Sequence, residues 1–280
     1  MTLEKLLLEL DYPPVIKKAV SDKIQTNIKQ IYDIASTAYT GENFQFALCN
    51  RMPLTRLAVI TFILLQKYDD YKSLDIDDTI IFDTFRDVSL RAKLYYHRTG
   101  KIGITKEDVI WFRHIINTVI FKIGTLQYQP FKMLYLDEET IGEPYMSFTP
   151  EQKEKLPAGT PVINCHVPYG TDLNPEVVEQ SFNDAVRFFR KYFPDIQYTA
   201  FLCYSWLLYP AMITILGSNS NIKQFAKRFD VIGFCDDPEQ AIENLFENGK
   251  KILQPNSSFL QRVAVDNIKM FGFACGIIQI

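Results

Sequence analysis

The stretch VINCHVPYGTDLNPEVVEQSF, residues 162–182, runs from an apolar segment through a short polar loop into a strongly marked helix start. Asn174 is a preferred helix cap, and Pro175 suits the first helical position, where its missing N–H is not needed. A buried strand followed at once by a helix predicts a layered fold of sheet and helix. The same helix start presents backbone N–H groups and a partial positive charge, which suit a phosphate or pyrophosphate group.

The loop between this strand and helix does not have the pattern of a standard phosphate loop. It contains no G-x-G-x-x-G or P-loop spacing, and Gly170 is its single glycine. Asp172 would repel an anion. The residues therefore leave two interpretations open, an anion-binding helix start and an ordinary strand-to-helix turn.

His166 stands at the end of the predicted strand, in a chain that has only three histidines. Side chains alternate along a strand, so His166 shares a face with Asn164, while Cys165 and Val167 point the other way. Such a histidine can act as a general base, or it can be a half-buried side chain that is hydrogen-bonded to a loop. The residues alone do not decide between these roles.

A second predicted strand lies in FLCYSWLLYP, residues 201–210. Alternation places Cys203 and Ser205 on one of its faces and Tyr204 on the other. A pair of His166 and Cys203 would suit a cysteine-dependent hydrolase. The apolar neighbours of Cys203 favour an inert, buried thiol instead.

The rest of the chain divides into a segment with a helical pattern and a segment in which strands and helices alternate. Helical periodicity covers almost all of residues 1–125. One apolar stripe is formed by Ile24, Ile28, Ile31 and Ala35. A capping box at 105–108 opens a helix that is predicted to run to Gly124. Residues 126–132 alternate and are aromatic, which indicates a strand. A connection rich in proline follows, with one helical turn at 150–155, and then strands and helices alternate. We predict an α+β protein with a helical domain at 1–125 and a mixed-sheet domain at 126–280.

Composition excludes several classes of function. The chain has 280 residues, 47% of them hydrophobic, and a formal charge of −3, so no bulk charge favours nucleic acid or an anionic membrane. No segment has the length and continuity of a membrane-spanning helix. The five cysteines are scattered and form no C-x-x-C pair, which favours a reduced, cytoplasmic protein without a zinc site. The aspartates of residues 69–83 lack calcium-loop spacing and fit a helix start.

Several longer segments carry a resemblance to a known family. They are LQYQPFKMLYLDEETIG (126–142), GTPVINCHVPYGTDLNPEVVEQSFNDAVRFFRKYFP (159–194), FLCYSWLLYPAM (201–212), SNIKQFAKRF (220–229) and FLQRVAVDNIKMFG (259–272). Together they resemble bacterial proteins in which a helical N-terminal acyltransferase domain precedes a GNAT-like C-terminal domain. The similarity extends over nearly the whole chain.

The resemblance implies an acyltransferase that uses acetyl-CoA or another acyl-CoA. It implies a sheet that splays open between two neighbouring strands, residues 162–168 and 199–208, with the pantetheine arm in the gap. The first of these strands would bind the arm near Val167, and the turn with Gly170, Thr171 and Asn174 would face the pyrophosphate. The usual Gln/Arg-x-x-Gly-x-Gly/Ala loop is replaced here by YGTDLN, residues 169–174.

We therefore predict an acyl-CoA-dependent N-acyltransferase that transfers an acyl group, most simply acetyl, to the amine of a small molecule or peptide. His166 is the candidate base, and Tyr204 or Ser205 is the candidate proton donor to the departing thiolate. Two alternatives remain, a non-catalytic binding protein that keeps the fold without the cofactor loop, and the cysteine hydrolase. The acceptor, the acyl length and the oligomeric state cannot be inferred from the sequence.

Overall fold

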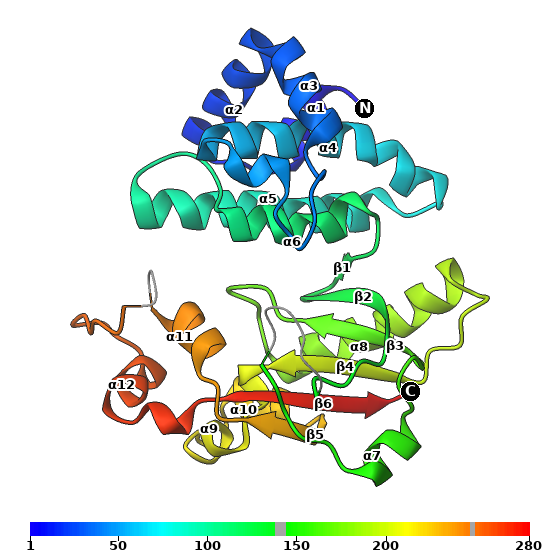
Figure 1. The fold of residues 1–280 in the computed structure, drawn as a ribbon, viewed down its shortest axis with the longest axis vertical. Coiled ribbons are helices and arrows are strands. Elements are labelled where there is room, and N and C mark those ends of the chain that lie inside the picture. Colours follow the sequence, from blue (N-terminus) through cyan, green and yellow to red (C-terminus); the bar gives the residue numbers. More distant parts are fainter. Residues whose placement is uncertain (138–143, 247–249) are drawn as a thin grey trace. The chain divides into compact units, whose positions relative to one another are not determined.

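The computed structural model describes residues 1–137, 144–246 and 250–280, and it separates into two units, Met1–Lys122 and Ile123–Ile280. The first unit is helical, and the second contains a six-stranded mixed sheet with helices (Figure 1). The predicted α+β class is therefore confirmed. None of the described helices is long and apolar enough to cross a membrane.

The helical unit is arranged around one central helix, α4. Its elements are α1 (Leu3–Glu9), α2 (Pro14–Thr26), α3 (Ile28–Thr37), the 3-10 turn η1 (Ala47–Asn50), α4 (Pro53–Ser73), α5 (Asp78–Thr99) and α6 (Lys106–Ile116). Four consecutive residues of α4, Leu57 to Ile60, are buried. A helix that buries all its sides needs neighbours all round, and α2, α3, α5 and α6 supply them.

Local start and stop signals are confirmed, but two predicted helices have different limits. The capping box of Thr105 and Asp108 opens α6, and Gly100 ends α5 in the left-handed conformation. The helix that carries the predicted stripe of Ile24, Ile28, Ile31 and Ala35 breaks at Asn27, so the stripe is wrong at Ile28, which is 48% exposed. α6 ends at Ile116 rather than at Gly124, because the β-branched run after it pairs as a strand.

Trp111 and His114 of α6 pack on each other, and Trp111 also contacts α5. Their rings meet edge to face at 5.4 Å, and the Trp111 indole N–H donates to Asp87 Oδ2 at 2.6 Å. Burial, with a smaller effect from the charge of Arg113, lowers the pKa of His114 to about 4. The folded helical unit therefore holds this histidine neutral.

We expect the helical unit to lose stability as the pH falls from about 6.5 to about 4. In that window the unfolded chain binds a proton at His114 that the folded chain does not, so the stabilisation is complete above pH 6.5 and lost on acidification. The lowered pKa of His114 corresponds to a loss of about 3 kcal/mol in the free energy of unfolding once the pH has fallen to about 4. Urea midpoints measured between pH 7 and 4.5 will show a shallower pH dependence in His114→Gln. His97→Gln, at an exposed histidine, is the matched control, and an equal change in both variants would contradict the assignment.

The second unit is built on one sheet with the strand order β1-β2-β3-β4-β6-β5. The strands are β1 (Phe121–Ile123), β2 (Leu126–Lys132), β3 (Pro161–His166), β4 (Ala200–Ser205), β5 (Asp230–Cys235) and β6 (Phe273–Gln279). β3 and β4 are parallel neighbours, while the β2–β3, β4–β6 and β5–β6 pairs are antiparallel. The helices are α7 (Pro150–Lys155), α8 (Pro175–Tyr192), α9 (Pro210–Thr214), α10 (Asn221–Ala226), α11 (Glu239–Leu245) and α12 (Phe259–Asp266), with the 3-10 turns η2 (Trp206–Leu208) and η4 (Ile268–Met270).

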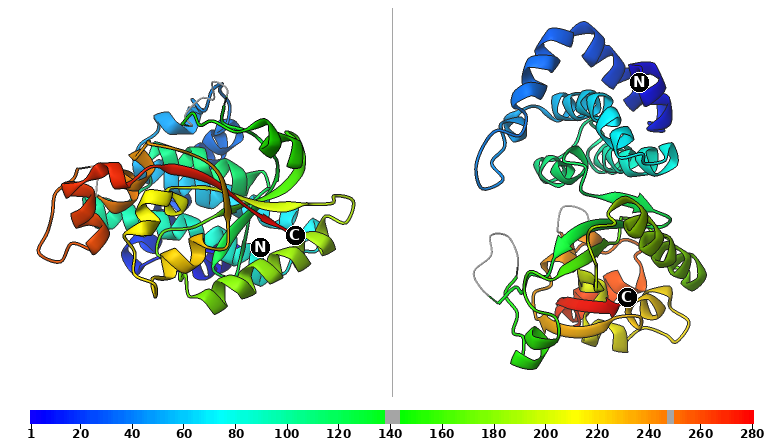
Figure 2. Two further views of the ribbon diagram at one scale, coloured as in Figure 1. Left: turned by 90° about the horizontal axis from the view of Figure 1, so that it is seen from below. Right: turned by 90° about the vertical axis from the view of Figure 1, so that its right-hand side faces the viewer.

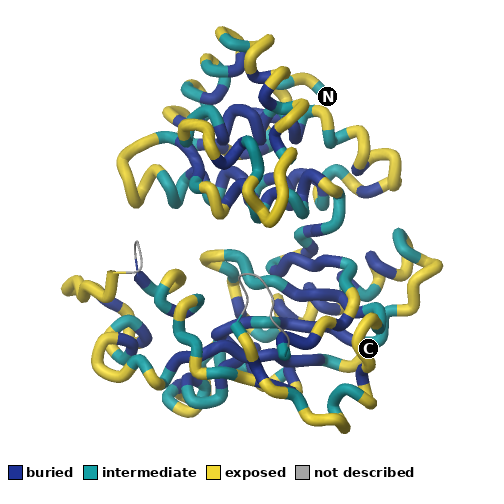
Figure 3. Tube along the Cα trace, viewed as in Figure 1, coloured by how far each residue is buried: buried dark blue, intermediate teal, exposed yellow. Residues whose placement is uncertain are grey.

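The two faces of the sheet carry different cores. α8 lies along one face (Figure 2), where Phe182 packs on Phe201 with ring centroids 4.8 Å apart and Tyr128 hydrogen-bonds Ser181. On the other face, Val162 and Leu202 belong to a buried cluster that also includes Met133, Met146 and Leu156. The buried stretches follow the strands of the sheet, as Figure 3 shows. The turn predicted at 150–155 is present as α7, and residues 138–143 of that connection lie outside the described part.

Candidate functional site

The candidate site lies where β3 and β4 stop pairing. Their parallel register joins Ile163 to Phe201 and Asn164 to Leu202. Among the residues the structure describes, these are the last ones that β3 and β4 pair with each other. β3 nevertheless continues to His166 and β4 to Ser205. The carboxyl ends of two neighbouring parallel strands thus extend beyond their last paired residues, and ligands of open α/β sheets bind at such ends.

His166 ends β3, beyond the last residue that β3 pairs with β4, and is half-buried. Its Nε2 lies 3.2 Å from Oε1 of Gln129 on β2, and because a carbonyl oxygen can only accept, Nε2 is the donor. That hydrogen bond selects the tautomer whose basic nitrogen is Nδ1. Gln129 thus orients the His166 imidazole, and a role of His166 as general base stays a prediction.

Tyr204 and Ser205 lie on opposite faces of β4. Tyr204 packs with Leu202 on the face that also carries Val162 and, by alternation, His166. His166 is two residues beyond Asn164, and Tyr204 is two residues beyond Leu202, so each lies the same number of residues past the last pair that β3 and β4 form. The Tyr204 hydroxyl donates to the carbonyl of Leu134, and its ring stacks on Phe273.

Ser205 faces the other side of the sheet. Its side chain is nearly buried, and its Oγ accepts the N–H of Leu207 at 3.1 Å, which caps η2. Of the two predicted donors, only Tyr204 shares a face with His166. A role of Ser205 in proton transfer stays a prediction.

Cys203 does not pair with His166. It is 1% exposed on the α8 face, beside Cys165, whereas His166 points to the opposite face. Burial, followed by the hydrogen bond between the two thiols, raises the pKa of Cys165. Because Cys203 is buried and faces away from His166, the two side chains cannot form the nucleophile–base pair that the hydrolase alternative needs.

The loop after β3 contains the four residues predicted to hold the cofactor. Val167 continues the strand end and is partly exposed. Gly170 has φ +72° and open space where a Cβ would be, so the backbone conformation, rather than crowding, requires glycine there. Both the N–H and the hydroxyl of Thr171 donate to the carbonyl of Pro168, which closes the turn.

The start of α8 is partly satisfied by its own side chains. Asn174 accepts the N–H of Glu176 at 3.0 Å, which confirms the predicted cap. Asp172 Oδ1 accepts the N–H of Asn174 at 2.8 Å, so a carboxylate stands at the positive end of this helix. Any pyrophosphate at this helix start would have to compete with these two side-chain oxygens.

Two buried amides on β2 belong to the same face and were not identified from the sequence. Gln127 is the register partner of His166, and Gln129 is that of Asn164. The alternation of LQYQ showed that both glutamines share a face, but only the register shows that this face includes His166. No group of three or more His, Cys, Asp or Glu residues that could hold a metal occurs in the described ranges.

Comparison with known proteins gives a family for each part of the chain. Residues 1–117 match the model of the N-acyltransferase N-terminal domain, and residues 120–277 match the model of the GNAT-like C-terminal domain. No curated protein matches the chain.

Solved structures of an acyltransferase share the fold. One is in complex with decanoyl-CoA and teicoplanin and another with CoA and 10C-teicoplanin, each with 16% identity and a TM-score of 0.74. A third, a tryptophan-to-alanine mutant in complex with octanoyl-CoA, has 15% identity and the same TM-score. Each alignment covers 99% of this chain and 87% of the other. The likeness extends over both units.

Proposed function

Because the chain belongs to the acyltransferase family that joins an N-acyltransferase N-terminal domain to a GNAT-like C-terminal domain, we propose that it transfers an acyl group from an acyl-CoA thioester to an amine. Acetyl is the simplest donor group. Octanoyl and decanoyl groups are the alternatives suggested by the ligands of the similar structures. The acceptor is a small molecule or a peptide.

The observation that supports this proposal best is that His166 and Tyr204 share a face, each two residues beyond the last pair that β3 and β4 form with each other. The thioester would lie in the gap between the two strands. His166 Nδ1 takes a proton from the amine as its nitrogen attacks the thioester carbon. The C–S bond breaks, and the hydroxyl of Tyr204 gives a proton to the departing thiolate.

The loop after β3 would hold the nucleotide part of coenzyme A. Val167 ends the strand along which the pantetheine arm would run, and the turn of Gly170 and Thr171 leads to the α8 helix start at Asn174. The N–H groups of that start favour an anion. Asp172 opposes it, which predicts modest affinity for the pyrophosphate.

Titration calorimetry with acetyl-, octanoyl- and decanoyl-CoA tests the donor, and release of free thiol with an amine present tests the transfer. A bound ester at one hundred times its Kd should stabilise the fold by about 2.7 kcal/mol. We expect a heat of binding with at least one of the three esters, and release of free thiol only when the amine is present. The absence of both with all three esters would refute the proposal.

Two substitutions in the loop test its contact with the cofactor. Gly170→Val forces a branched residue to φ +72°, which costs about 1–3 kcal/mol of folding free energy and blocks the approach of the pyrophosphate. Asp172→Asn keeps an oxygen for the N–H of Asn174 but removes the negative charge, so the Kd for acyl-CoA should fall about two- to fivefold. Calorimetry and melting temperatures of both variants check this. If Gly170→Val alters stability alone and Asp172→Asn leaves the Kd unchanged, the loop does not bind the cofactor.

The second candidate is a non-catalytic binding protein with the same fold. It is favoured by the occupied helix start, where Asn174 and Asp172 already take N–H groups, and by YGTDLN in place of the usual pyrophosphate loop. This candidate predicts that amines or peptides bind, while titration with an acyl-CoA gives no heat of binding.

A further inference from the structure

Gln127 presents an amide with an unused donor beside the candidate base. The residue is 2% exposed, and its Nε2 has no hydrogen-bond partner in the described part of the chain. A buried N–H without a partner destabilises the folded state, so folded proteins seldom keep one without a use for it. The amide is therefore placed to bind an acceptor atom of a ligand.

The register fixes where this donor stands. Gln127 and His166 are direct partners in the antiparallel β2–β3 pair, so their side chains share a face with Cβ atoms about 4.5–5.5 Å apart. His166 is half-buried, whereas Gln127 is almost fully buried. The two side chains are therefore neighbours on one face, with His166 nearer to solvent.

The position of β2 indicates which substrate meets Gln127. β2 lies on the side of β3 away from β4, roughly 4.8 Å further from the gap proposed for the thioester. The partner of Gln127 is then on the acceptor rather than on the acyl-CoA. Together, His166 and Gln127 can address two neighbouring groups of the acceptor, its amine nitrogen and an atom close to it.

The chemistry of the row defines that second group. The row consists of three neutral amides, Gln127, Gln129 and Asn164, together with His166, so the described residues in it carry no fixed charge. An amide N–H donates, and a neutral oxygen is its natural partner in a buried place. A carbonyl and a hydroxyl oxygen both fit this requirement.

We propose that Gln127 selects acceptors in which a neutral oxygen, carbonyl or hydroxyl, is borne on the carbon next to the one that carries the amine. This rests on the proposed function, because it takes His166 as the base that meets the amine. Gln127 would hold the oxygen through Nε2–H while His166 Nδ1 receives the proton. Amines without that oxygen leave the donor buried and unpaired, and they react more slowly.

Two pairs of amines of matched shape test the selection. Glycinamide is compared with 2-methylallylamine for the carbonyl, and 2-aminoethanol with propylamine for the hydroxyl. For the wild type we expect kcat/KM to be about 10–100-fold higher for the oxygen-bearing member of at least one pair. The pair with the larger ratio identifies the kind of oxygen.

Gln127→Leu should bring that ratio close to one without lowering the melting temperature, because it replaces an unpaired donor by an apolar group of similar size. Gln127→Glu, which exchanges the N–H for an oxygen, should also abolish the preference and covers the case in which the leucine variant fails to fold. Gln30→Leu, at an exposed position of α3, should keep the wild-type ratio. A ratio near one in the wild type, or a wild-type ratio in a folded Gln127 variant, would overturn the inference.

Direct binding separates this inference from the proposed function. If no amine is acylated, saturation-transfer NMR with glycinamide and 2-aminoethanol, in the absence of acyl-CoA, still reports the contact. Preferential binding that is lost in Gln127→Leu would support the donor although acyl transfer had failed. Equal binding by wild type and variant would overturn it.

Discussion

Replacement of His166 with glutamine should lower kcat/KM for acyl transfer by about 10²–10⁴-fold, the usual contribution of general base catalysis. Glutamine keeps a polar side chain that can hydrogen-bond Gln129, but it has no nitrogen that can take a proton. The loss should appear in kcat, with little change in the Kd for acyl-CoA, because His166 meets the amine in the transition state and not the cofactor. Steady-state kinetics together with calorimetry measure both quantities.

The pH dependence gives a second and more specific readout. In the wild type the rate should fall on the acidic side as the base becomes protonated, and this limb should be absent in His166→Gln. His97→Gln should leave the rate and its pH profile unchanged. A His166→Gln enzyme that keeps the acidic limb would show that another group is the base.

Sequence signals succeeded where they act through neighbouring residues. The Thr105–Asp108 capping box, the Asn174–Pro175 helix start and the alternation that separates His166 from Cys165 depend on spacings of one to three residues. Such patterns carry their own hydrogen bonds or their own period, so no tertiary information is needed to interpret them. They were enough to predict the α+β class.

The errors came where tertiary packing decides. The break at Asn27 exposes Ile28, which helical periodicity alone would bury with Ile24 and Ile31. Residues after Ile116 continue a helical pattern, yet Phe121–Ile123 pair with β2 as an edge strand. Propensity is a weak prior in such segments, because the partner surface determines the structure adopted.

The site could be predicted only in part for the same reason. Alternation gave the faces of His166, Tyr204 and Ser205, whereas the neighbourhood of β3 and β4 was expected from the family resemblance alone, and only the register shows that their pairing ends at Asn164 and Leu202. The opposition of Gln127 and His166 depends on strand register, and a slip of one residue would move every side chain to the other face. Register is a property of two strands, so neither segment alone contains it.

The largest effect on stability is expected from Arg91→Leu in α5, which should lower the free energy of unfolding of the helical unit by about 3 kcal/mol. Arg91 reaches Asp108 Oδ1 at 3.0 Å and Asp87 Oδ2 at 3.4 Å, and the Asp87 side chain is only 3% exposed. Removal of the arginine leaves the Asp87 carboxylate buried without its positively charged partner. The carboxylate keeps only the hydrogen bond from the indole N–H of Trp111. Because Arg91 itself is about one-third exposed, we expect the loss at the lower end of the range for broken buried pairs.

Fluorescence of Trp111 reports this loss directly. The chain has two tryptophans, and a Trp206→Phe background leaves Trp111 as the single probe, next to the altered charges. Urea unfolding at neutral pH should show the full effect, and on mild acidification the difference from the wild type at the same pH should shrink, because the stranded carboxyl group becomes protonated. The double variant Arg91→Leu/Asp87→Asn should be more stable than Arg91→Leu alone, because the buried charge is then gone.

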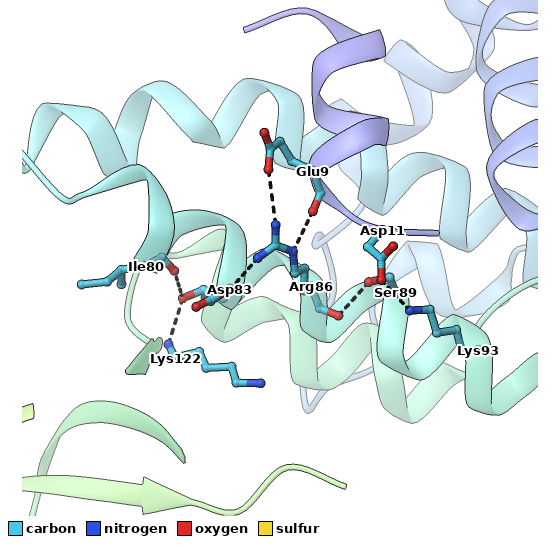
Figure 4. A network of polar contacts seen from close by, with 9 residues as sticks. Glu9, Asp11, Ile80, Asp83, Arg86, Ser89, Lys93 and Lys122 are labelled. Carbon is cyan, nitrogen blue, oxygen red and sulfur yellow. Dashed lines mark hydrogen bonds and ion pairs between the residues drawn. The ribbon is translucent and has the colours of Figure 1, made fainter. Parts of the chain in front are cut away.

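Arg86, five residues earlier on the same helix, provides the matched control. It forms ion pairs with Glu9 and Asp83 (Figure 4), but its side chain is 39% exposed and its partners are 31% and 35% exposed. Exposed pairs contribute about 0–1 kcal/mol, so Arg86→Leu should destabilise the unit far less, although it also loses a hydrogen bond to the carbonyl of Glu9. The two arginines each pair with two carboxylates and differ mainly in the burial of the carboxylates they neutralise. Equal losses would mean that lost contacts, rather than a stranded buried charge, set the cost, and the pH recovery in Arg91→Leu would then be absent as well.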